Sequence, residues 1–232
     1  MKLLVVRHGQ TPWNTKNKLQ GREANKRYFN ELNQNGRKQA KDLAERIKST
    51  NEHIDMIISS PLRRAKGTAK ILKEQLKIDN IVFDPRIADR GYGKFSGTTR
   101  ESFGGTKYSY RDFWDYNKNV EYDNGAENIK EFEARIKSFL DECVQKYPDK
   151  TILLIMHVSG TKMVNCLIGS GIPNNGIISG NGLENGEIAE YNIEKTNKRE
   201  EFLSGIRENQ KQVVRLRGTS YGRTIKIHKS RE

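Results

Sequence analysis

Short apolar runs recur along the chain, and most are followed by an amphipathic stretch with helical spacing. Four runs have the dense apolar pattern of buried strands in a parallel sheet: residues 3–6, 55–59, 81–83 and 151–156. Apolar residues at helical spacing predict helices over 33–49, 61–77 and 160–168, and a further helix that residues 125–128 lead into and that ends at 146. The segment 183–192 predicts a half-buried closing strand. Alternation of this kind predicts an α/β fold, a three-layer α/β/α sandwich around a mostly parallel central sheet.

Two of these strands end at a histidine. Arg7 and His8 follow the first run, and His157 follows the most apolar run, TILLIM. Ligands bind at the carboxyl ends of strands in open α/β sheets. Gly9 would let the backbone turn sharply there and approach a ligand closely. We therefore expect both histidines to face one cavity.

A third strand end supplies more positive charge. After the run 55–59, Ser60 is predicted to cap a helix and Pro61 to occupy its first position. Arg63 and Arg64 would then lie in the first helical turn, beside a helix end that favours anions. Arginine binds phosphate oxygens through paired hydrogen bonds, and a neutral imidazole can attack phosphorus. No carboxylate or cysteine cluster suggests a metal, and no other cofactor is expected.

Composition narrows the class of protein. The chain of 232 residues is predicted to form one domain, 1–193, followed by a basic extension, 194–232. The extension holds eleven Lys/Arg against five Asp/Glu, and the whole chain has a net charge of +13. Within the extension, 197–212 has the pattern of a basic helix and 213–228 that of a hairpin. No apolar run is long enough to span a membrane, and two cysteines do not make a disulfide framework. We expect a cytoplasmic protein.

An aromatic insertion interrupts the alternating pattern. Residues 98–124 hold seven aromatic side chains and no clear periodicity. Long segments of this kind in compact domains are often functional. The insertion is therefore expected either to cap a pocket or to pack onto the body of the domain, and the sequence leaves both possibilities open.

Five motifs together resemble the histidine phosphatase superfamily, the phosphoglycerate-mutase-like fold. VRHGQTPWN resembles its RHG(E/Q)(T/S)xxN signature, and SSPLRRAKGTA resembles its SSPLxRAxxTA segment. RIADRGYGKFSG is similar to the family's acid loop, GAEN to its GES element, and ILLIMH to the strand before the second histidine. The motifs occur in the family's order and cover roughly residues 2–193.

The resemblance implies a role for each matching residue. His8 would be the nucleophile that becomes phosphohistidine, and Asp89 falls where the family has a glutamate acid. The phosphate pocket would be formed by Arg7, Asn14, Arg64 and His157. Substrate contacts are implied for Gln20, Gly21, Tyr92 and Arg100. The implied activity is metal-independent hydrolysis of a small phosphorylated metabolite.

Departures from the family pattern keep alternatives open. Asp89 is one methylene shorter than glutamate, and Val158 stands where glycine is usual. A β-branched Val158 is expected to resist a positive φ and to crowd the substrate pocket. The mutases carry an arginine pair in the insertion, where this chain has Tyr116 and Asn117 with only Arg111 close by, so a phosphatase is favoured over a phosphoglycerate mutase. A further alternative is a catalytically weakened phosphate-binding protein whose basic tail binds nucleic acid or another polyanion; otherwise no nucleic-acid or membrane partner is expected.

Overall fold

A single mixed sheet forms the centre of the molecule. The computed structural model describes residues 1–26, 30–103, 106–172, 175–178, 182–193 and 215–216. The sheet has the order β3-β2-β4-β1-β5-β6. Its strands are β1 (Lys2–Arg7), β2 (Met56–Ser59), β3 (Ile81–Phe83), β4 (Thr151–Met156), β5 (Ile188–Asn192) and β6 (Arg215–Leu216). The first four strands in that order are parallel, and β5 and β6 add antiparallel pairs.

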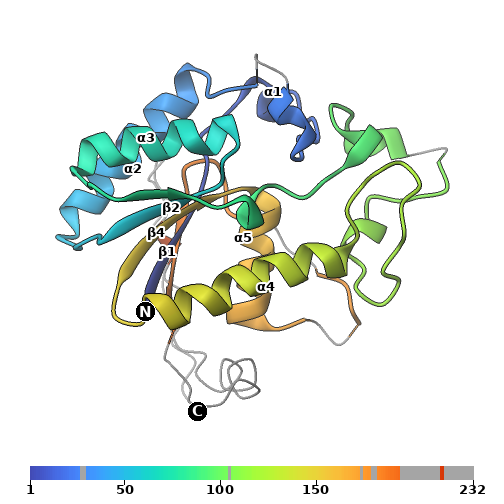
Figure 1. Ribbon diagram of the computed structural model, residues 1–232. Coiled ribbons are helices and arrows are strands. Elements are labelled where there is room, and N and C mark those ends of the chain that lie inside the picture. The colour runs from blue at the N-terminus through green and yellow to red at the C-terminus, as the bar shows by residue number, and fades with distance from the viewer. Residues whose placement is uncertain (27–29, 104–105, 173–174, 179–181, 194–214, 217–232) are drawn as a thin grey trace, which may run out of the picture.

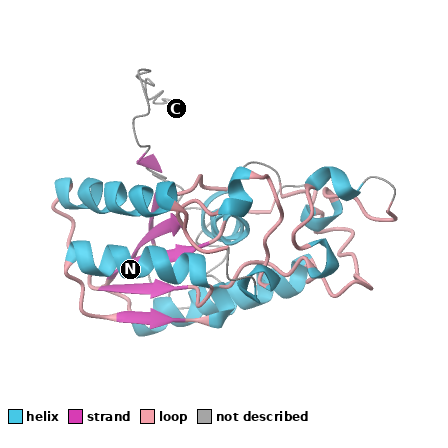
Figure 2. Ribbon diagram, turned by 90° about the horizontal axis from the view of Figure 1, so that it is seen from above, coloured by secondary structure: helices cyan, strands magenta, loops and turns pink. Residues whose placement is uncertain are grey.

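Helices cover both faces of this sheet, as Figures 1 and 2 show. On one face, α2 (Gln34–Ser49) and α3 (Arg63–Leu76) pack against Leu4 and Val6 of β1. On the other, α4 (Ile129–Lys146) and α5 (Val158–Val164) pack against Leu3 and Val5. Successive residues of a strand point to opposite faces, so a strand buried on both sides must be apolar throughout. The predicted three-layer α/β/α sandwich is confirmed.

Local capping chemistry explains where two of the helices begin. Asn33 caps α2 by accepting a hydrogen bond from the Gly36 amide at 2.8 Å. Asn128 and Glu131 form a reciprocal capping box at the start of α4. In both cases a polar side chain satisfies an amide that the helix itself leaves unpaired.

The predicted start of α3 was wrong. The helix begins at Arg63 with Leu62 as its N-cap residue, and Leu62 supplies no side-chain hydrogen bond. Ser60 lies two residues before this N-cap; its hydroxyl accepts a hydrogen bond from the Leu62 amide at 3.3 Å and lies 2.8 Å from Nε2 of His157. At the predicted helix 160–168, α5 starts earlier, at Val158, and continues into a π-helical segment, Asn165–Ser170.

Short helical segments build the loops around the carboxyl ends of the strands. They are α1 (Pro12–Thr15) and the 3-10 turns η1 (Glu23–Lys26), η2 (Pro85–Ile87), η3 (Gly93–Phe95), η4 (Arg100–Phe103) and η5 (Asp112–Trp114). Within the aromatic insertion, Phe113 is fully buried and stacks on Tyr122 with ring centroids 4.5 Å apart. Part of the insertion therefore packs into the core, as one of the two expectations had it.

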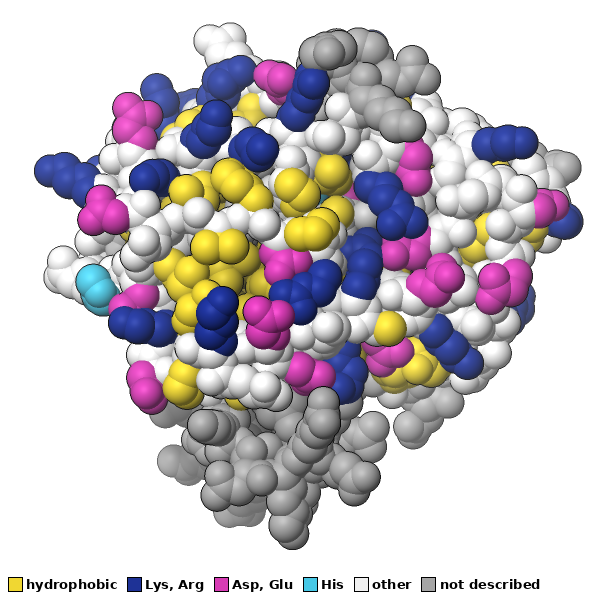
Figure 3. Space-filling view, viewed as in Figure 1, with side chains coloured by type: hydrophobic (Ala, Val, Ile, Leu, Met, Phe, Trp, Pro, Cys, Tyr) yellow, Lys and Arg dark blue, Asp and Glu magenta, His cyan; other side chains and the backbone are white. Residues whose placement is uncertain are grey.

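The surface carries mixed charge and one apolar edge. Figure 3 shows basic and acidic side chains interspersed on one face, with hydrophobic side chains gathered between them. At the sheet edge, Val82 and Phe83 of β3 are exposed. No helix in the described part of the chain is long and apolar enough to cross a bilayer. The helix predicted over 197–212 lies outside the described residues, and of the hairpin predicted over 213–228 only β6 is described.

Candidate active site

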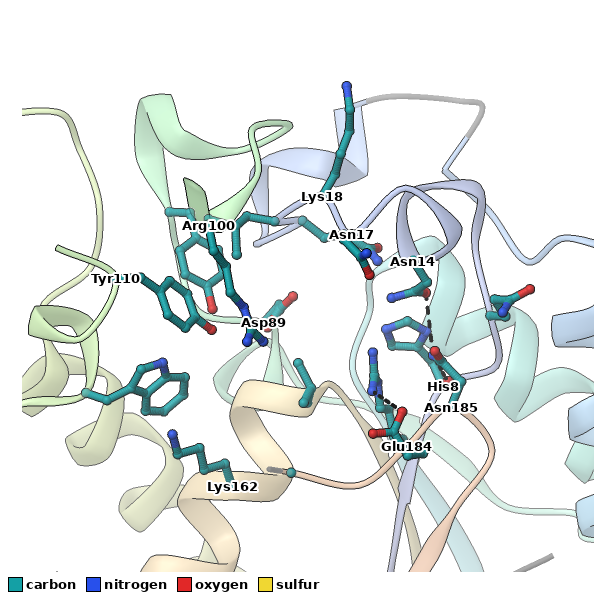
Figure 4. A pocket seen from close by; sticks show the side chains of 18 of the residues that line it. His8, Asn14, Asn17, Lys18, Asp89, Arg100, Tyr110, Lys162, Glu184 and Asn185 are labelled. Carbon is teal, nitrogen blue, oxygen red and sulfur yellow. Dashed lines mark hydrogen bonds and ion pairs between the residues drawn. The ribbon is translucent and has the colours of Figure 1, made fainter. Parts of the chain in front are cut away.

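A cavity of about 650 Å³ opens beside the carboxyl ends of β1 and β4. Figure 4 shows His8 and Asn14 on one side of it and Arg100, Tyr110 and Lys162 on the other. The residues that line it come from the loop after β1, the acid loop, the aromatic insertion, α5 and the loop before β5: Arg7, His8, Gln10, Asn14, Asn17, Lys18, Leu19, Gln20, Asp89, Tyr92, Arg100, Glu101, Tyr110, Trp114, Val158, Lys162, Gly182, Glu184 and Asn185.

The two predicted histidines lie together. The ring centroids of His8 and His157 are 5.1 Å apart, and both rings are buried. Nε of Arg64 lies 3.2 Å from Nε2 of His8 and 3.2 Å from Nδ1 of His157. Because a guanidinium only donates, both nitrogens accept there and carry lone pairs. The parallel neighbours β1 and β4 therefore bring both imidazoles together, as expected. Only His8 lines the cavity, however, and the predicted pocket residues His157 and Arg64 are buried and are not among the lining residues.

Outer hydrogen bonds hold each ring in one tautomer. His8 Nδ1 donates to the carbonyl of Gly9 at 2.7 Å, which leaves Nε2 unprotonated. His157 Nε2 donates to the hydroxyl of Ser60 at 2.8 Å, which leaves Nδ1 unprotonated. Sequence reasoning missed Ser60 in this role and took it for a helix cap. Its partner is far away in the chain and becomes its neighbour only through the pairing of β2 with β4.

Burial and nearby cations keep both imidazoles neutral. Burial, followed by the charge of Arg64, lowers the pKa of His8 well below its usual value, and the same two causes lower the pKa of His157. A neutral imidazole has the free electron pair that nucleophilic attack requires. His8 Nε2 is thus both unprotonated and directed toward the centre of the site.

Two arginines supply the positive charge. Arg64 is 1% exposed and donates to Asp89 Oδ2 at 2.8 Å and to the carbonyl of Gly21 at 3.0 Å. Arg7 donates to the carbonyl of Leu183 at 3.0 Å and lies 3.6 Å from a Glu184 carboxylate oxygen. Burial lowers the pKa of both guanidiniums, but arginine keeps its charge at neutral pH. The site therefore holds two fixed cations beside two neutral rings.

Asp89 is buried in the same site and firmly held. Its Oδ1 accepts hydrogen bonds from the hydroxyl of Ser159 and from the amide of Arg90, and its Oδ2 accepts from Arg64. The Arg135 guanidinium donates to the Asp89 carbonyl at 3.0 Å and pairs with Glu127 at 2.7 Å, which fastens the acid loop to α4. Ser159 and Arg135 were not predicted, because neither lies near Asp89 in the sequence.

The residues expected to contact substrate mostly line the cavity. They are Asn14, Gln20, Tyr92, Arg100 and Val158; Gly21 is not among the lining residues and contributes its carbonyl to Arg64. Val158 is the first residue of α5 and is not among the residues with positive φ, so the expected backbone strain was wrong. From the aromatic insertion, Tyr110 and Trp114 also reach the cavity, whereas Arg111, Tyr116 and Asn117 do not line it.

Comparison with known proteins identifies the family. The sequence model of the histidine phosphatase superfamily (branch 1) matches residues 3–204. The chain belongs to this superfamily. Among histidine phosphatases, it is 29% identical over 170 residues to phosphoserine phosphatase 1 of Hydrogenobacter thermophilus, covering 72% of this chain and 76% of the relative. It is 32% identical over 169 residues to the uncharacterized phosphatase PhoE of Bacillus subtilis, covering 73% of this chain and 78% of that relative.

Solved structures of this superfamily have the same fold. Bacillus stearothermophilus YhfR aligns with a TM-score of 0.71 at 21% identity, covering 83% of this chain and 91% of that one. The phosphoserine phosphatase of Entamoeba histolytica, solved with 3-phosphoglyceric acid, aligns with a TM-score of 0.68 at 26% identity and covers 83% and 90%. The family resemblance stated from the motifs is confirmed.

Proposed function

We propose that this histidine phosphatase hydrolyses small phosphorylated metabolites through a phosphohistidine at His8. The observation that carries the proposal is the placement of His8 Nε2, unprotonated and 3.2 Å from Nε of a buried arginine. Relatives named as phosphoserine phosphatases support the substrate class. Fixed guanidiniums stabilise the charge on a transferring phosphoryl group, which is the principal demand of this chemistry.

The first step forms the covalent intermediate. The substrate phosphate enters between Arg7 and Arg64, and Arg64 exchanges its contacts with the imidazoles for phosphate oxygens. His8 Nε2 attacks phosphorus, the P–O ester bond breaks, and Asp89 in its protonated form donates its proton to the departing alcohol. The phosphate group binds as its monoanion, and its P–OH donates a hydrogen bond to the unprotonated Nδ1 of His157.

The second step returns the enzyme to its starting state. Water gives a proton to the Asp89 carboxylate and attacks the phosphohistidine. The P–N bond breaks, its electron pair returns to His8 Nε2, and inorganic phosphate leaves. Ser159 and the Arg90 amide hold Asp89 in place for both proton transfers.

Substitution of His8 tests the proposal. We expect His8→Ala to abolish turnover of p-nitrophenyl phosphate and to abolish labelling by substrate that carries radioactive phosphate. Wild-type activity is expected to withstand a chelator, because arginines rather than a metal bind the phosphate. His53→Ala is the control, since its ring is on the surface. Full turnover by His8→Ala would overturn the proposal.

A phosphoglycerate mutase is the second candidate, because relatives carry that name. Such an enzyme returns the phosphoryl group to a bound product rather than to water. The absence of Arg111 from the lining residues favours the phosphatase. Incubation with 3-phosphoglycerate decides between them: free phosphate supports the phosphatase, and the positional isomer supports the mutase. The alternative of a polyanion-binding tail concerns residues outside the described part and stays a prediction.

A further inference from the structure

The arginine next to the proposed acid is buried among aromatic rings. Arg90 follows Asp89 in the sequence, and its side chain is fully buried and is not among the residues that line the cavity. Its Cζ lies 5.0 Å from the ring centroid of Phe113, 5.6 Å from that of Trp114 and 5.9 Å from that of Phe132. Arg90 is therefore a cation that lies behind the cavity wall rather than in it.

No carboxylate lies within ion-pair distance of this guanidinium in the part of the chain that the structure describes. The charge of Glu127 acts on Arg90, but that carboxylate is paired with Arg135 at 2.7 Å. Burial lowers the pKa of Arg90, although arginine keeps its charge at neutral pH. A buried charge without a carboxylate partner costs free energy that an apolar side chain in the same place would not cost. What Arg90 contributes in return is the set of hydrogen bonds that its guanidinium donates.

The guanidinium joins three segments that are separate in the sequence. Its Nε and one terminal nitrogen donate to the carbonyl of Glu127, at 3.0 Å and 2.8 Å, just before α4. Its other terminal nitrogen donates to the carbonyl of Phe113, in η5 of the aromatic insertion. Trp114, the next residue, lines the cavity together with Tyr110, and these two form the insertion wall. One side chain therefore ties the acid loop to the insertion wall and to the start of α4.

The backbone of the same residue holds the acid itself. The Arg90 amide donates to Oδ1 of Asp89 at 3.0 Å, and the hydroxyl of Ser159 donates to the same oxygen. Figure 4 shows Asp89 between the side of the cavity that carries His8 and the side that carries Tyr110. The amide of Arg90 thus orients the carboxyl group, while its guanidinium fixes the insertion wall beyond it.

We propose that Arg90 is a positioning residue for protonation of the leaving group, because it fixes Asp89 and the insertion wall relative to each other. This inference rests on the proposed phosphatase function. As His8 Nε2 forms its bond to phosphorus, the P–O ester bond breaks and its electron pair goes to the alcohol oxygen, which takes the proton of Asp89. Arg90 keeps its charge and its protons throughout. It acts by keeping the departing oxygen within reach of the acid, and a small misplacement is enough to slow this transfer.

Two aryl esters of similar shape test the proposal, phenyl phosphate and p-nitrophenyl phosphate. Each places an aromatic ring in the cavity, but phenolate is the poorer leaving group and needs the proton more. Arg90→Met keeps an unbranched side chain among the rings and removes the donors and the charge. We expect it to lower kcat/KM roughly tenfold or more for phenyl phosphate and less than about threefold for p-nitrophenyl phosphate. The ratio of the two values does not depend on the fraction of folded enzyme, so a loss of stability cannot mimic this result.

A double substitution shows whether Arg90 acts through Asp89. Asp89→Asn alone is expected to lower the same ratio, kcat/KM for phenyl phosphate over that for p-nitrophenyl phosphate. Arg90→Met added to Asp89→Asn should then leave the ratio unchanged within about twofold, because no acid remains to be positioned. A purely structural role for Arg90 would instead lower both rates by one factor in each background.

Arg86→Met is the matched control, because Arg86 belongs to the same loop and also lies over an aromatic ring. Its Cζ is 5.7 Å from the ring centroid of Phe139, and its side chain pairs with Asp84 at 2.6 Å. Arg86 does not line the cavity. Its replacement is expected to leave the ratio as in wild type, even where the urea midpoint falls.

Arg90→Lys covers the case in which Arg90→Met does not fold, because lysine keeps the charge and some of the donors. It should lower the ratio by a smaller factor, since it lacks the planar fork that holds two carbonyls. The inference is overturned if folded Arg90→Met, or Arg90→Lys where only that variant folds, keeps the wild-type ratio. It is also overturned if Arg90→Met lowers the ratio equally in the Asp89→Asn background. Failure of the phosphatase proposal shows itself separately, as full turnover by His8→Ala.

Discussion

His8 and His157 are each held in one tautomer by a hydrogen bond on the side of the ring away from Arg64. The Gly9 carbonyl and the Ser60 hydroxyl accept hydrogen bonds from the two ring N–H groups. Arg64 Nε donates to the two unprotonated ring nitrogens. Such outer contacts decide which nitrogen can react. The rings are therefore held ready for an anion before one arrives, and their neutrality has a measurable consequence for stability.

Stability should fall steeply below pH 6.5 in phosphate-free buffer. Burial lowers the folded pKa of both histidines, so that as pH falls below 6.5 the unfolded chain takes up protons that the folded chain does not. Each ring is expected to cost up to about 2 kcal/mol of unfolding free energy at pH 5, and none above about pH 7.5. Urea unfolding at pH 7.5 and pH 5 measures the difference.

Replacing His8 tests whether the buried histidines cause this pH dependence of the unfolding free energy. His8→Asn should reduce the loss between pH 7.5 and pH 5, because one of the two buried rings is gone. His53→Asn should leave the loss as in wild type, since the side chain of His53 is 86% exposed. An identical pH dependence in wild type and His8→Asn would contradict the assignment.

Asp89 is expected to matter most for substrates with poor leaving groups. An alkoxide needs a proton as it departs, whereas p-nitrophenolate leaves without one. Asp89→Asn should lower kcat/KM for O-phosphoserine by roughly a hundredfold or more, the usual size of general acid catalysis. The loss for p-nitrophenyl phosphate should be much smaller. The ratio kcat/KM is the proper measure, because it covers only steps up to the phosphohistidine; equal losses would point to another acid.

Site residues could be predicted where their chemistry lies within a local motif. Arg7, His8 and His157 directly follow apolar strands, and the structure brings the two histidine rings together as expected, although only Arg7 and His8 line the cavity and His157 is fully buried. Ser60 and Lys162 could not be assigned in this way. The contact of Ser60 with His157 depends on strand pairing, and the position of Lys162 over Trp114 depends on how an aperiodic insertion packs against α5.

The loop after β1 is set by backbone packing against the start of α2. A Cβ on Gly36 would lie 2.1 Å from the carbonyl oxygen of Gln10, and a Cβ on Gly9 would lie 2.3 Å from that of Gly36. The Asn33 amide also donates to the Gln10 carbonyl at 3.0 Å. Only glycine permits two backbones to approach so closely. The loop that carries His8 is thus held by a helix that contributes no side chain to the chemistry.

Gly36→Ala should therefore impair both stability and catalysis. The added methyl group meets backbone atoms that cannot rotate away, and overpacking of this kind costs about 1–3 kcal/mol. We expect a lower urea midpoint and a reduced kcat for p-nitrophenyl phosphate, because the loop must shift and His8 with it.

Gly67→Ala is the matched control, because Gly67 also lies inside a helix, α3. Its added Cβ would meet only the end of the Leu32 side chain, at 3.2 Å, which can rotate. Alanine's better helix propensity, worth up to about 1 kcal/mol, should then leave stability unchanged or raised, with kcat unchanged. Equal losses in the two variants would show that close backbone packing is not what holds the loop.

Elements with a clear period could be predicted from the sequence, and those set by tertiary contacts could not. The sheet and the helices α2 and α4 follow the expected apolar spacing. The start of α3 differs because the helix begins only at Arg63 while Ser60 contacts His157, and α5 begins directly after His157. The aromatic insertion divides between core packing at Phe113 and cavity lining at Tyr110 and Trp114, which no single period encodes.

Charge is distributed unevenly over the molecule, and this bears on how substrate arrives. Of the net charge of +13, the extension 194–232 carries +6, so residues 1–193 retain +7. The face in Figure 3 mixes both signs. Four of the residues that line the cavity are basic, namely Arg7, Lys18, Arg100 and Lys162, and three are acidic, Asp89, Glu101 and Glu184, so that the lining itself has an excess of one positive charge. A positive field focused at a cavity attracts anions and weakens as salt is added.

Ionic strength should therefore change how strongly the enzyme attracts and binds phosphate esters, and leave the rate of the chemical steps unchanged. Raising the salt from about 0.01 M to about 0.15 M shortens the screening length from roughly 30 Å to roughly 8 Å. We expect KM for p-nitrophenyl phosphate to rise several-fold while kcat stays within about twofold, because the groups that act on the bound phosphate are buried. Arg100→Met should flatten the salt dependence, and Lys130→Met, outside the cavity, should flatten it less. A KM that does not change over this range would show that local contacts alone, without the wider field, bring the substrate to His8.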